Sequence, residues 1–122
     1  MDYHLLSGAD LAFIGDAYYE LCIREYVLNN GVTKLWQLHS KSVSYVSRTS
    51  QNYIVTTLMD ELTEEEVGIF KRGRNYDYKD KSAEYVNASG FEAVVGYLYL
   101  KKDFERLDYI IKKSIDIIEN KE

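Results

Sequence analysis

Apolar and polar residues follow one another at helical spacing along most of this chain. The pattern predicts a short helical turn over residues 33–38 and helices over about 8–30, 40–62, 64–73, 87–102 and 103–122, with a polar loop over 74–86. Ser7 is a suitable N-cap for the first helix and Gly31 a suitable end, and Thr63 with Glu66 predicts a capping box. The sequence has no convincing strand pattern, so we expect an all-α helical bundle.

Two acidic residues lie in segments that are otherwise free of charge. Asp16 is the only charged residue of segment 11–19, and Glu92 is the only one of segment 89–98. A helix that is apolar nearly all round is buried or lies at a subunit interface, and an unpaired carboxylate is costly there. A glycine accompanies each acid: Gly15 precedes Asp16, and another glycine lies one turn after Glu92. Such small residues let another backbone, a metal ion or a ligand approach closely.

The two acids have several possible explanations. Each could accept a hydrogen bond from a buried tyrosine, pair with a buried arginine or face solvent. Alternatively, if the two helices converge, Asp16 and Glu92 supply two hard oxygen ligands without His or Cys, which favours Mg²⁺ or Mn²⁺ over zinc. Glu20, one turn after Asp16, could join such a site, although a salt bridge to Arg24 is the simpler interpretation.

The overall charge of the chain is a poor guide to its partners. The 122 residues carry 15 Lys and Arg against 20 Asp and Glu, a net charge of −5, which argues against a nucleic-acid partner. Positive charge is nevertheless concentrated in two segments. Residues 31–59 hold three cations and no acid, and residues 71–81 hold five cations and two acids. These segments are candidate contacts for a phosphate backbone.

The two basic segments place their cations differently. Four polar residues of the expected helix 40–62 recur at i, i+3, i+7 and i+10 and form one stripe: Lys41, Ser44, Arg48 and Gln51. In the second segment, the first two cations lie at a helix C-terminus, where they complement the helix dipole. Arg74 and Asn75 lie in the loop beyond, where they offer hydrogen-bond donors to a phosphate.

The remaining composition limits the class of protein. Cys22 is the only cysteine, which excludes an internal disulfide and a cysteine zinc cage and suits a reducing compartment. No apolar run approaches the roughly 18 residues that a membrane span needs. We therefore expect a single cytoplasmic domain over residues 1–122 with no membrane contact.

Three segments of the chain together resemble one enzyme family. The signature helix of the ribonuclease III catalytic domain is similar to residues 11–17 (LAFIGDA), and the second acidic helix of that domain is similar to residues 89–100 (SGFEAVVGYLYL). The short bacterial branch called Mini-III, which consists of the catalytic domain without a double-stranded-RNA-binding domain, has a hallmark that resembles residues 71–75 (KRGRN). The three motifs occur in the family's order, and the resemblance extends over about residues 7–110.

This resemblance implies an all-helical homodimer that cuts double-stranded RNA with Mg²⁺, for which Mn²⁺ could substitute, and that trims paired stems of the large-subunit ribosomal RNA precursor. By position, Asp16 and Glu92 match the family's metal-binding and catalytic carboxylates, and Phe13 matches an aromatic that inserts into the partner subunit. Where larger members carry two further acids, this chain has Ala12 and Ser89, as Mini-III proteins do. Waters and RNA phosphate oxygens are then expected to complete the metal shell.

Double-stranded RNA in the A form is recognised largely by shape, through its phosphates and 2′-hydroxyls. For these contacts we predict polar residues of both basic segments: Lys41, Ser44, Arg48, Gln51, Arg72, Arg74, Asn75, Lys79 and Lys81. Two alternatives stay open. One is a non-catalytic RNA-binding module on the same fold, which needs the basic residues but not the acids. The other is a helical dimerisation or adaptor domain whose acids are merely paired.

Overall fold

A computed structural model describes residues 1–121, which contain six α-helices, two short 3-10 helices and no strand. The helices are α1 (Gly8–Asn29), α2 (Leu35–Val46), α3 (Arg48–Leu58), α4 (Glu64–Arg74), α5 (Ala83–Lys101) and α6 (Phe104–Glu119), with η1 (Tyr3–Leu5) before α1 and η2 (Met59–Glu61) after α3. The expected all-α class is confirmed. None of the helices in this range is long and apolar enough to cross a membrane.

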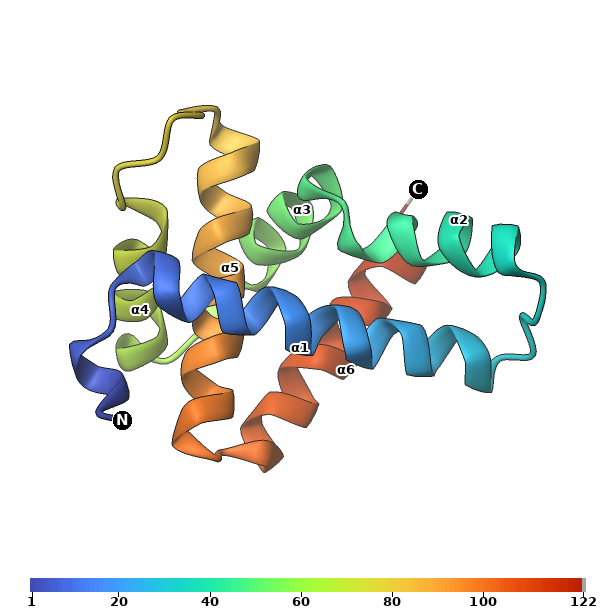
Figure 1. Cartoon of the computed structure of the whole chain (residues 1–122), viewed down its shortest axis with the longest axis horizontal. Helices are drawn as coiled ribbons and strands as arrows, with labels where there is room; N and C mark the ends of the chain where they lie inside the picture. The colour runs from blue at the N-terminus through green and yellow to red at the C-terminus, as the bar shows by residue number, and fades with distance from the viewer. Residues whose placement is uncertain (122) are drawn as a thin grey trace.

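Helix α5 is the centre of the bundle. It crosses behind α1, with α4 on one side and α3 on the other, and α6 runs back from its C-terminal end (Figure 1). Within residues 88–98 of α5, only Glu92 is not fully buried. Helix α2 lies along the second half of α1 and extends the bundle at one end (Figure 1). Glu92 is therefore the one acidic residue within the buried segment of the central helix.

The predicted N-cap at Ser7 and the predicted capping box at Thr63 are both confirmed, and Ser7 also forms a capping box that the sequence did not predict. Ser7 caps α1 together with Asp10, and Thr63 caps α4 together with Glu66. In each case the cap side chain accepts a hydrogen bond from a backbone N–H that has no partner inside the helix. Gly31 lies just beyond α1 with φ of +83°, a conformation that glycine adopts without strain. The predicted limits of α1 and α4 are therefore confirmed to within a residue or two.

The prediction of one long helix over residues 40–62, preceded by a separate turn, is wrong. α2 begins already at Leu35 and ends at Val46, and Ser47 then leaves the helical conformation with ψ of 157°. The Ser47 hydroxyl accepts a hydrogen bond from the backbone N–H of Ser50 at 3.2 Å and so caps α3. Serine favours this break because its side chain binds free backbone donors at a helix start.

The polar loop after α4 is shorter than predicted. α5 begins at Ala83 instead of near residue 87, because the Ser82 hydroxyl caps it by accepting a hydrogen bond from the backbone N–H of Tyr85 at 3.3 Å. The additional turn has a consequence for the site. It places Tyr85 on the same helix face as Glu92, seven residues later.

Candidate active site

α1 and α5 cross with their backbones in direct contact. A Cβ atom added to Gly15 would lie 1.7 Å from the carbonyl oxygen of Glu92, and one added to Gly96 would lie 1.9 Å from the carbonyl oxygen of Leu11. Both distances are far below van der Waals contact, so the approach requires glycine at both positions. The sequence left open whether the glycines let another backbone, a metal ion or a ligand approach. Gly15 and Gly96 let the backbone of the neighbouring helix approach.

The crossing brings the two acids of the apolar helices together. Asp16 is exposed on α1, Glu92 is half-buried on α5, and the two carboxyl groups lie close enough for Asp16 to raise the pKa of Glu92. Burial, followed by the hydrogen bond and the negative charge of Asp16, raises the pKa of Glu92 to about 8. A hydrogen bond from Gln51 and the positive charge of Arg48 act in the opposite direction.

Both carboxyl groups open into a cleft of about 330 Å³ between α1, α3, α5 and the loop that precedes α5. Ala12 and Ser89 also line this cleft, so the two positions at which the resemblance leads us to expect further acids in larger enzymes face the same space. The other polar and aromatic side chains of the lining are Phe13, Arg48, Gln51, Tyr78 and Tyr85.

The residues of the cleft fit a magnesium ion better than a zinc ion. Asp16 and Glu92 are the two carboxylates that line this cleft, and within residues 1–121 no group of three or more His, Cys, Asp and Glu side chains could hold a metal. Two carboxylates supply hard oxygen donors, and a cation between them would relieve the repulsion that raises the pKa of Glu92. Glu20 does not join them: it forms the expected salt bridge with Arg24 at 2.9 Å.

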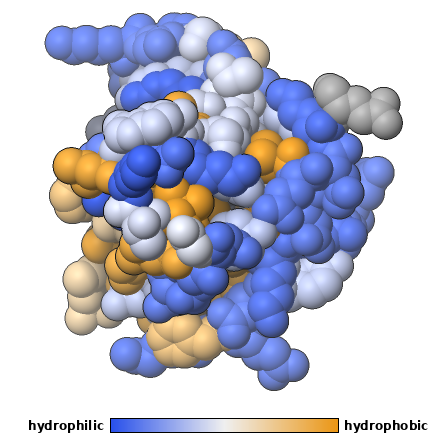
Figure 2. Space-filling view, turned by 90° about the vertical axis from the view of Figure 1, so that its right-hand side faces the viewer, coloured by the Kyte–Doolittle hydropathy of each residue, from blue (hydrophilic) through white to orange (hydrophobic). Residues whose placement is uncertain are grey.

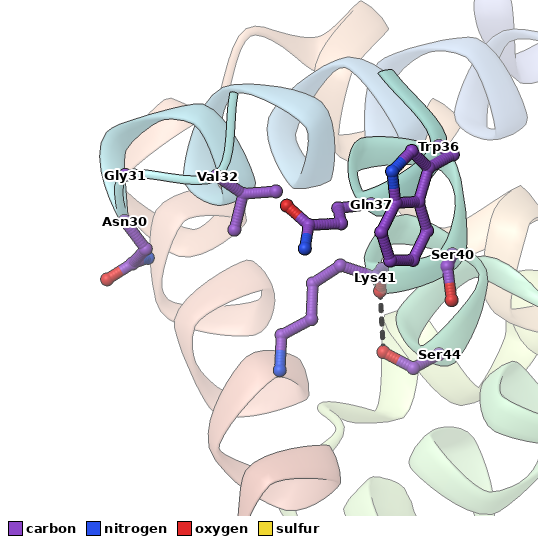
Figure 3. Close-up of a pocket in the computed structure, with 8 residues that line it drawn as sticks. All are labelled: Asn30, Gly31, Val32, Trp36, Gln37, Ser40, Lys41 and Ser44. Atoms are coloured by element: carbon purple, nitrogen blue, oxygen red, sulfur yellow. Dashed lines mark hydrogen bonds between the residues drawn. The ribbon is translucent and has the colours of Figure 1, made fainter. Parts of the chain in front are cut away.

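The stripe predicted along one helix is divided by the break at Ser47. Arg48 lines the acidic cleft, and its guanidinium carbon lies 4.1 Å from the centre of the Tyr85 ring. Gln51 is buried beneath the same cleft. Lys41 and Ser44 instead line a wide, shallow pocket of about 540 Å³ between the end of α1 and α2, where the Ser44 hydroxyl donates to the Lys41 carbonyl oxygen (Figure 3).

The residues of the second basic segment have different surroundings. The Arg72 guanidinium donates to the backbone carbonyl oxygens of His4 and Leu6, at 3.4 and 3.3 Å, and so holds the start of the chain against α4. The prediction that Arg74 lies in the loop is wrong: it is the last residue of α4, is half-buried and donates to the side chain of Asn75, the C-cap, at 3.3 Å. Lys79 is exposed, as is Lys81, which pairs with Asp77 four residues earlier.

Two tyrosines of the cleft were not among the predicted site residues. Tyr85 packs against Arg48, and Tyr78 lies beside Tyr85 with its hydroxyl donating to the Gly73 carbonyl oxygen at 2.7 Å. Their signal in the sequence is the spacing of Tyr85 to Glu92, which corresponds to one helix face. It was missed because the predicted loop extended through residue 86.

Phe13 lies at the rim of the cleft with 79% of its surface exposed. It begins a line of exposed apolar side chains on the outer face of α1, which continues with Leu21 and Leu28 and reaches Leu35 on α2. Figure 2, a view onto the end of the molecule formed by α1 and α2, shows hydrophobic side chains at the surface among polar ones. The role of Phe13 in a subunit contact stays a prediction.

Comparisons with known proteins identify the family of this chain. The family model of the ribonuclease III domain matches residues 9–103. The Mini-ribonuclease 3 of Streptococcus pneumoniae is 39% identical to this chain over 98% of both sequences. That of Staphylococcus aureus is 38% identical and covers 93% of this chain and 90% of its own.

A solved structure extends the similarity to the fold. The crystal structure of a protein from Fusobacterium nucleatum superposes with a TM-score of 0.83 and 33% identity, covering 94% of this chain and 96% of the other. The domain match includes both acids and both glycines of the helix crossing. This chain therefore belongs to the ribonuclease III family, and within it to the Mini-ribonuclease 3 group.

Proposed function

We propose that this chain is a Mg²⁺-dependent endoribonuclease that cuts double-stranded RNA as a homodimer. Endonuclease activity on double-stranded RNA follows from membership of the ribonuclease III family. The observation that carries the proposed mechanism is the acidic pair, Asp16 and Glu92, held side by side in an open cleft by two backbone contacts. Two neighbouring carboxylates are suited to coordinate a hard cation.

Asp16 and Glu92 would hold the metal ion through carboxylate oxygens. An Mg²⁺ ion held by these residues would supply Lewis-acid chemistry to the scissile phosphate and to the attacking water. Glu92 is fixed by its half-buried position, whereas exposed Asp16 leaves the mouth of the cleft accessible to RNA and water. Hydrolysis then leaves a 5′-phosphate and a 3′-hydroxyl.

Arg48 is the predicted RNA contact nearest to the acids. Its planar guanidinium lies on the Tyr85 ring, which keeps the cation at the cleft and supports the binding of a phosphate oxygen. Other predicted contacts extend away from the cleft on α2, at the end of α4 and on the loop that follows: Lys41, Ser44, Arg74, Asn75, Lys79 and Lys81. Because such contacts are electrostatic, we expect RNA affinity to fall steeply with salt and to depend little on sequence.

A second copy of the chain is the partner that we propose for the outer face of α1. Phe13 and Leu21 are 79% and 64% exposed. Large apolar side chains exposed on one helix face are typical of a surface that another protein covers. Two copies would present one acidic cleft to each strand and make a staggered double cut. We further propose that the substrate is a paired stem of the large-subunit ribosomal RNA precursor and that the protein works in the bacterial cytoplasm, where that RNA is made.

The test is cleavage of a long double-stranded RNA by the purified protein with Mg²⁺, with and without a chelator. We expect defined shorter duplexes that disappear when the metal is removed. Asp16→Asn and Glu92→Gln should each lower the cleavage rate by at least about a thousandfold, because each removes a charged metal ligand. Glu25→Gln, which removes an exposed carboxylate from the same helix as Asp16, is the matched control and should cut normally.

The outcomes separate the proposal from its alternatives. Binding of double-stranded RNA without cleavage, unaffected by the Asp16 and Glu92 substitutions, would support a non-catalytic RNA-binding module. A dimer that neither binds nor cuts RNA would support a dimerisation or adaptor domain. Either result would overturn the catalytic assignment of the acidic pair.

A further inference from the structure

Gln51 occupies an unusual position for a polar residue. Only 3% of its surface is exposed, although glutamine is normally found at the surface of proteins. It lies in the first turns of α3, beneath the cleft that contains the acidic pair. Its side-chain amide connects the break between α2 and α3 to the acidic helix α5.

The Gln51 amide nitrogen has two acceptors. Nε2 donates to the carbonyl oxygen of Val46 at 3.0 Å and to Oε2 of Glu92 at 3.4 Å. Val46 is the last residue of α2, so its carbonyl oxygen has lost its helical partner and needs a donor. This bond fixes the plane of the amide, and the second N–H then points to Glu92. The assignment of nitrogen and oxygen follows from Val46, whose carbonyl can only accept.

The Gln51 amide oxygen has no partner. Within residues 1–121, Oε1 of Gln51 is the only buried side-chain nitrogen or oxygen that makes no hydrogen bond. Such an atom normally lowers stability, and an apolar side chain of the same size would avoid the loss only by leaving the Val46 carbonyl oxygen without its donor. Packing alone therefore does not account for a glutamine here. What the glutamine adds is a neutral donor directed at one oxygen of a candidate metal ligand.

We propose that Gln51 is a positioning residue for Glu92: by binding one carboxylate oxygen it fixes the orientation of the other and thereby sets the affinity of the acidic pair for a divalent cation. The inference rests on the proposed function and gives Gln51 a role different from direct RNA contact. A neutral amide suits this role because it holds the carboxylate without competing with the cation, as a lysine or arginine would. Groups that orient metal ligands commonly contribute 10- to 100-fold to metal affinity.

The experiment measures binding of Mn²⁺ to the protein without RNA, by electron paramagnetic resonance or calorimetry. Gln51→Met keeps the length and volume of the side chain but removes the donor. We expect it to bind Mn²⁺ about 10- to 100-fold more weakly. Gln37→Met, the same change at an exposed glutamine of α2, should bind like the unmodified protein. Equal Mn²⁺ affinity in all three proteins would overturn the proposal.

Cleavage kinetics give an independent readout. Gln51→Met should require a higher Mg²⁺ concentration for half-maximal cleavage and recover most of its rate at excess Mg²⁺, with unchanged affinity for RNA in metal-free buffer. A rate that excess Mg²⁺ does not restore, or a loss of RNA affinity, would assign Gln51 to another role. If the unmodified protein binds Mn²⁺ but cuts no double-stranded RNA, the proposed function fails while Mn²⁺ affinity still decides the role of Gln51.

A measurement on the unmodified protein covers the case in which the variant does not fold. The two side-chain amide protons of Gln51 give distinct nuclear magnetic resonance signals, and the proton bound to Glu92 should move when a cation binds that carboxylate. We expect the signal to shift with Mg²⁺ concentration along the same binding curve as the backbone signal of Glu92. A Gln51 signal that stays in place at saturating Mg²⁺ would overturn the proposal.

Discussion

The two faces of α1 impose opposite requirements on the sequence. On the inner face, Gly15 contacts α5 backbone to backbone, and even one additional carbon would lie 1.7 Å from the Glu92 carbonyl oxygen. On the outer face, Phe13 and Leu21 are large, apolar and mostly exposed. The inner face is fully packed against α5 within one chain, whereas the outer face exposes apolar surface that no part of the same chain covers.

The difference shows which part of the site one chain can build. The acidic pair depends on the inner face, because the glycine contacts set the separation of α1 and α5 and with it the separation of Asp16 and Glu92. The rim of the cleft depends on the outer face, where Phe13 lies beside the same cleft. A partner on that face would therefore finish the cleft without altering the acids.

The largest effect is expected from adding a methyl group to the inner face. Gly15→Ala or Gly96→Ala should destabilise the protein by at least about 3 kcal/mol, because the contacted atoms are rigid backbone and the helices must separate. That is a large part of the stability of a domain of this size. Urea unfolding followed by circular dichroism measures it. A cooperative transition with the midpoint of the unmodified protein would show that the helices do not cross as described.

A smaller effect, on association alone, is expected from truncating the outer face. Phe13→Ala should weaken dimerisation by about 100-fold while the monomer keeps its stability, because this side chain is 79% exposed in one chain. Sedimentation equilibrium measures the change. Phe104→Ala, the same substitution at an exposed phenylalanine of α6, is the control and should leave association unchanged. An unmodified protein that is monomeric at micromolar concentration would contradict the proposed interface.

The sequence predicted some parts of the site and not others. The pairing of Asp16 with Glu92 could be anticipated, since isolated charges in apolar helices and nearby glycines are local features of the sequence. The position of Gln51 could not, because it depends on the break at Ser47, where a serine cap competes with continuation of the helix. Arg48 and Tyr85 come together from helices whose predicted limits were wrong, so their contact depended on tertiary structure.

The acidic pair should also make the stability of the metal-free protein depend on pH. The pKa of Glu92 is raised to about 8 in the folded state, so between its ordinary value and that pKa the folded chain binds more protons than the unfolded chain. Stability should therefore fall as the pH rises from 5 to 8, by about 2 kcal/mol once solvent in the open cleft is allowed for. Glu92→Gln should lack this component.

Unfolding in urea at several pH values, with a chelator present, measures that difference. The comparison between the unmodified protein and Glu92→Gln cancels the contributions of all other titrating groups. Saturating Mg²⁺ should reduce the slope, because the ion favours the ionised carboxylate. Parallel stability curves for the two proteins would show that Glu92 ionises as freely in the folded chain as in the unfolded one.

The smallest effect is expected from a Gly→Ala substitution at a position where the added methyl group contacts no other atom. Gly68 lies inside α4, and a Cβ atom added there would have no atom within 4 Å. Gly68→Ala should therefore stabilise the protein by about 0.5–1 kcal/mol, the helix preference of alanine over glycine. Urea unfolding beside Gly15→Ala then compares one methyl group in two settings. If Gly68→Ala loses as much stability as Gly15→Ala, an added methyl group is costly whether or not backbone atoms oppose it, and the loss in Gly15→Ala is then not evidence for the contact between α1 and α5.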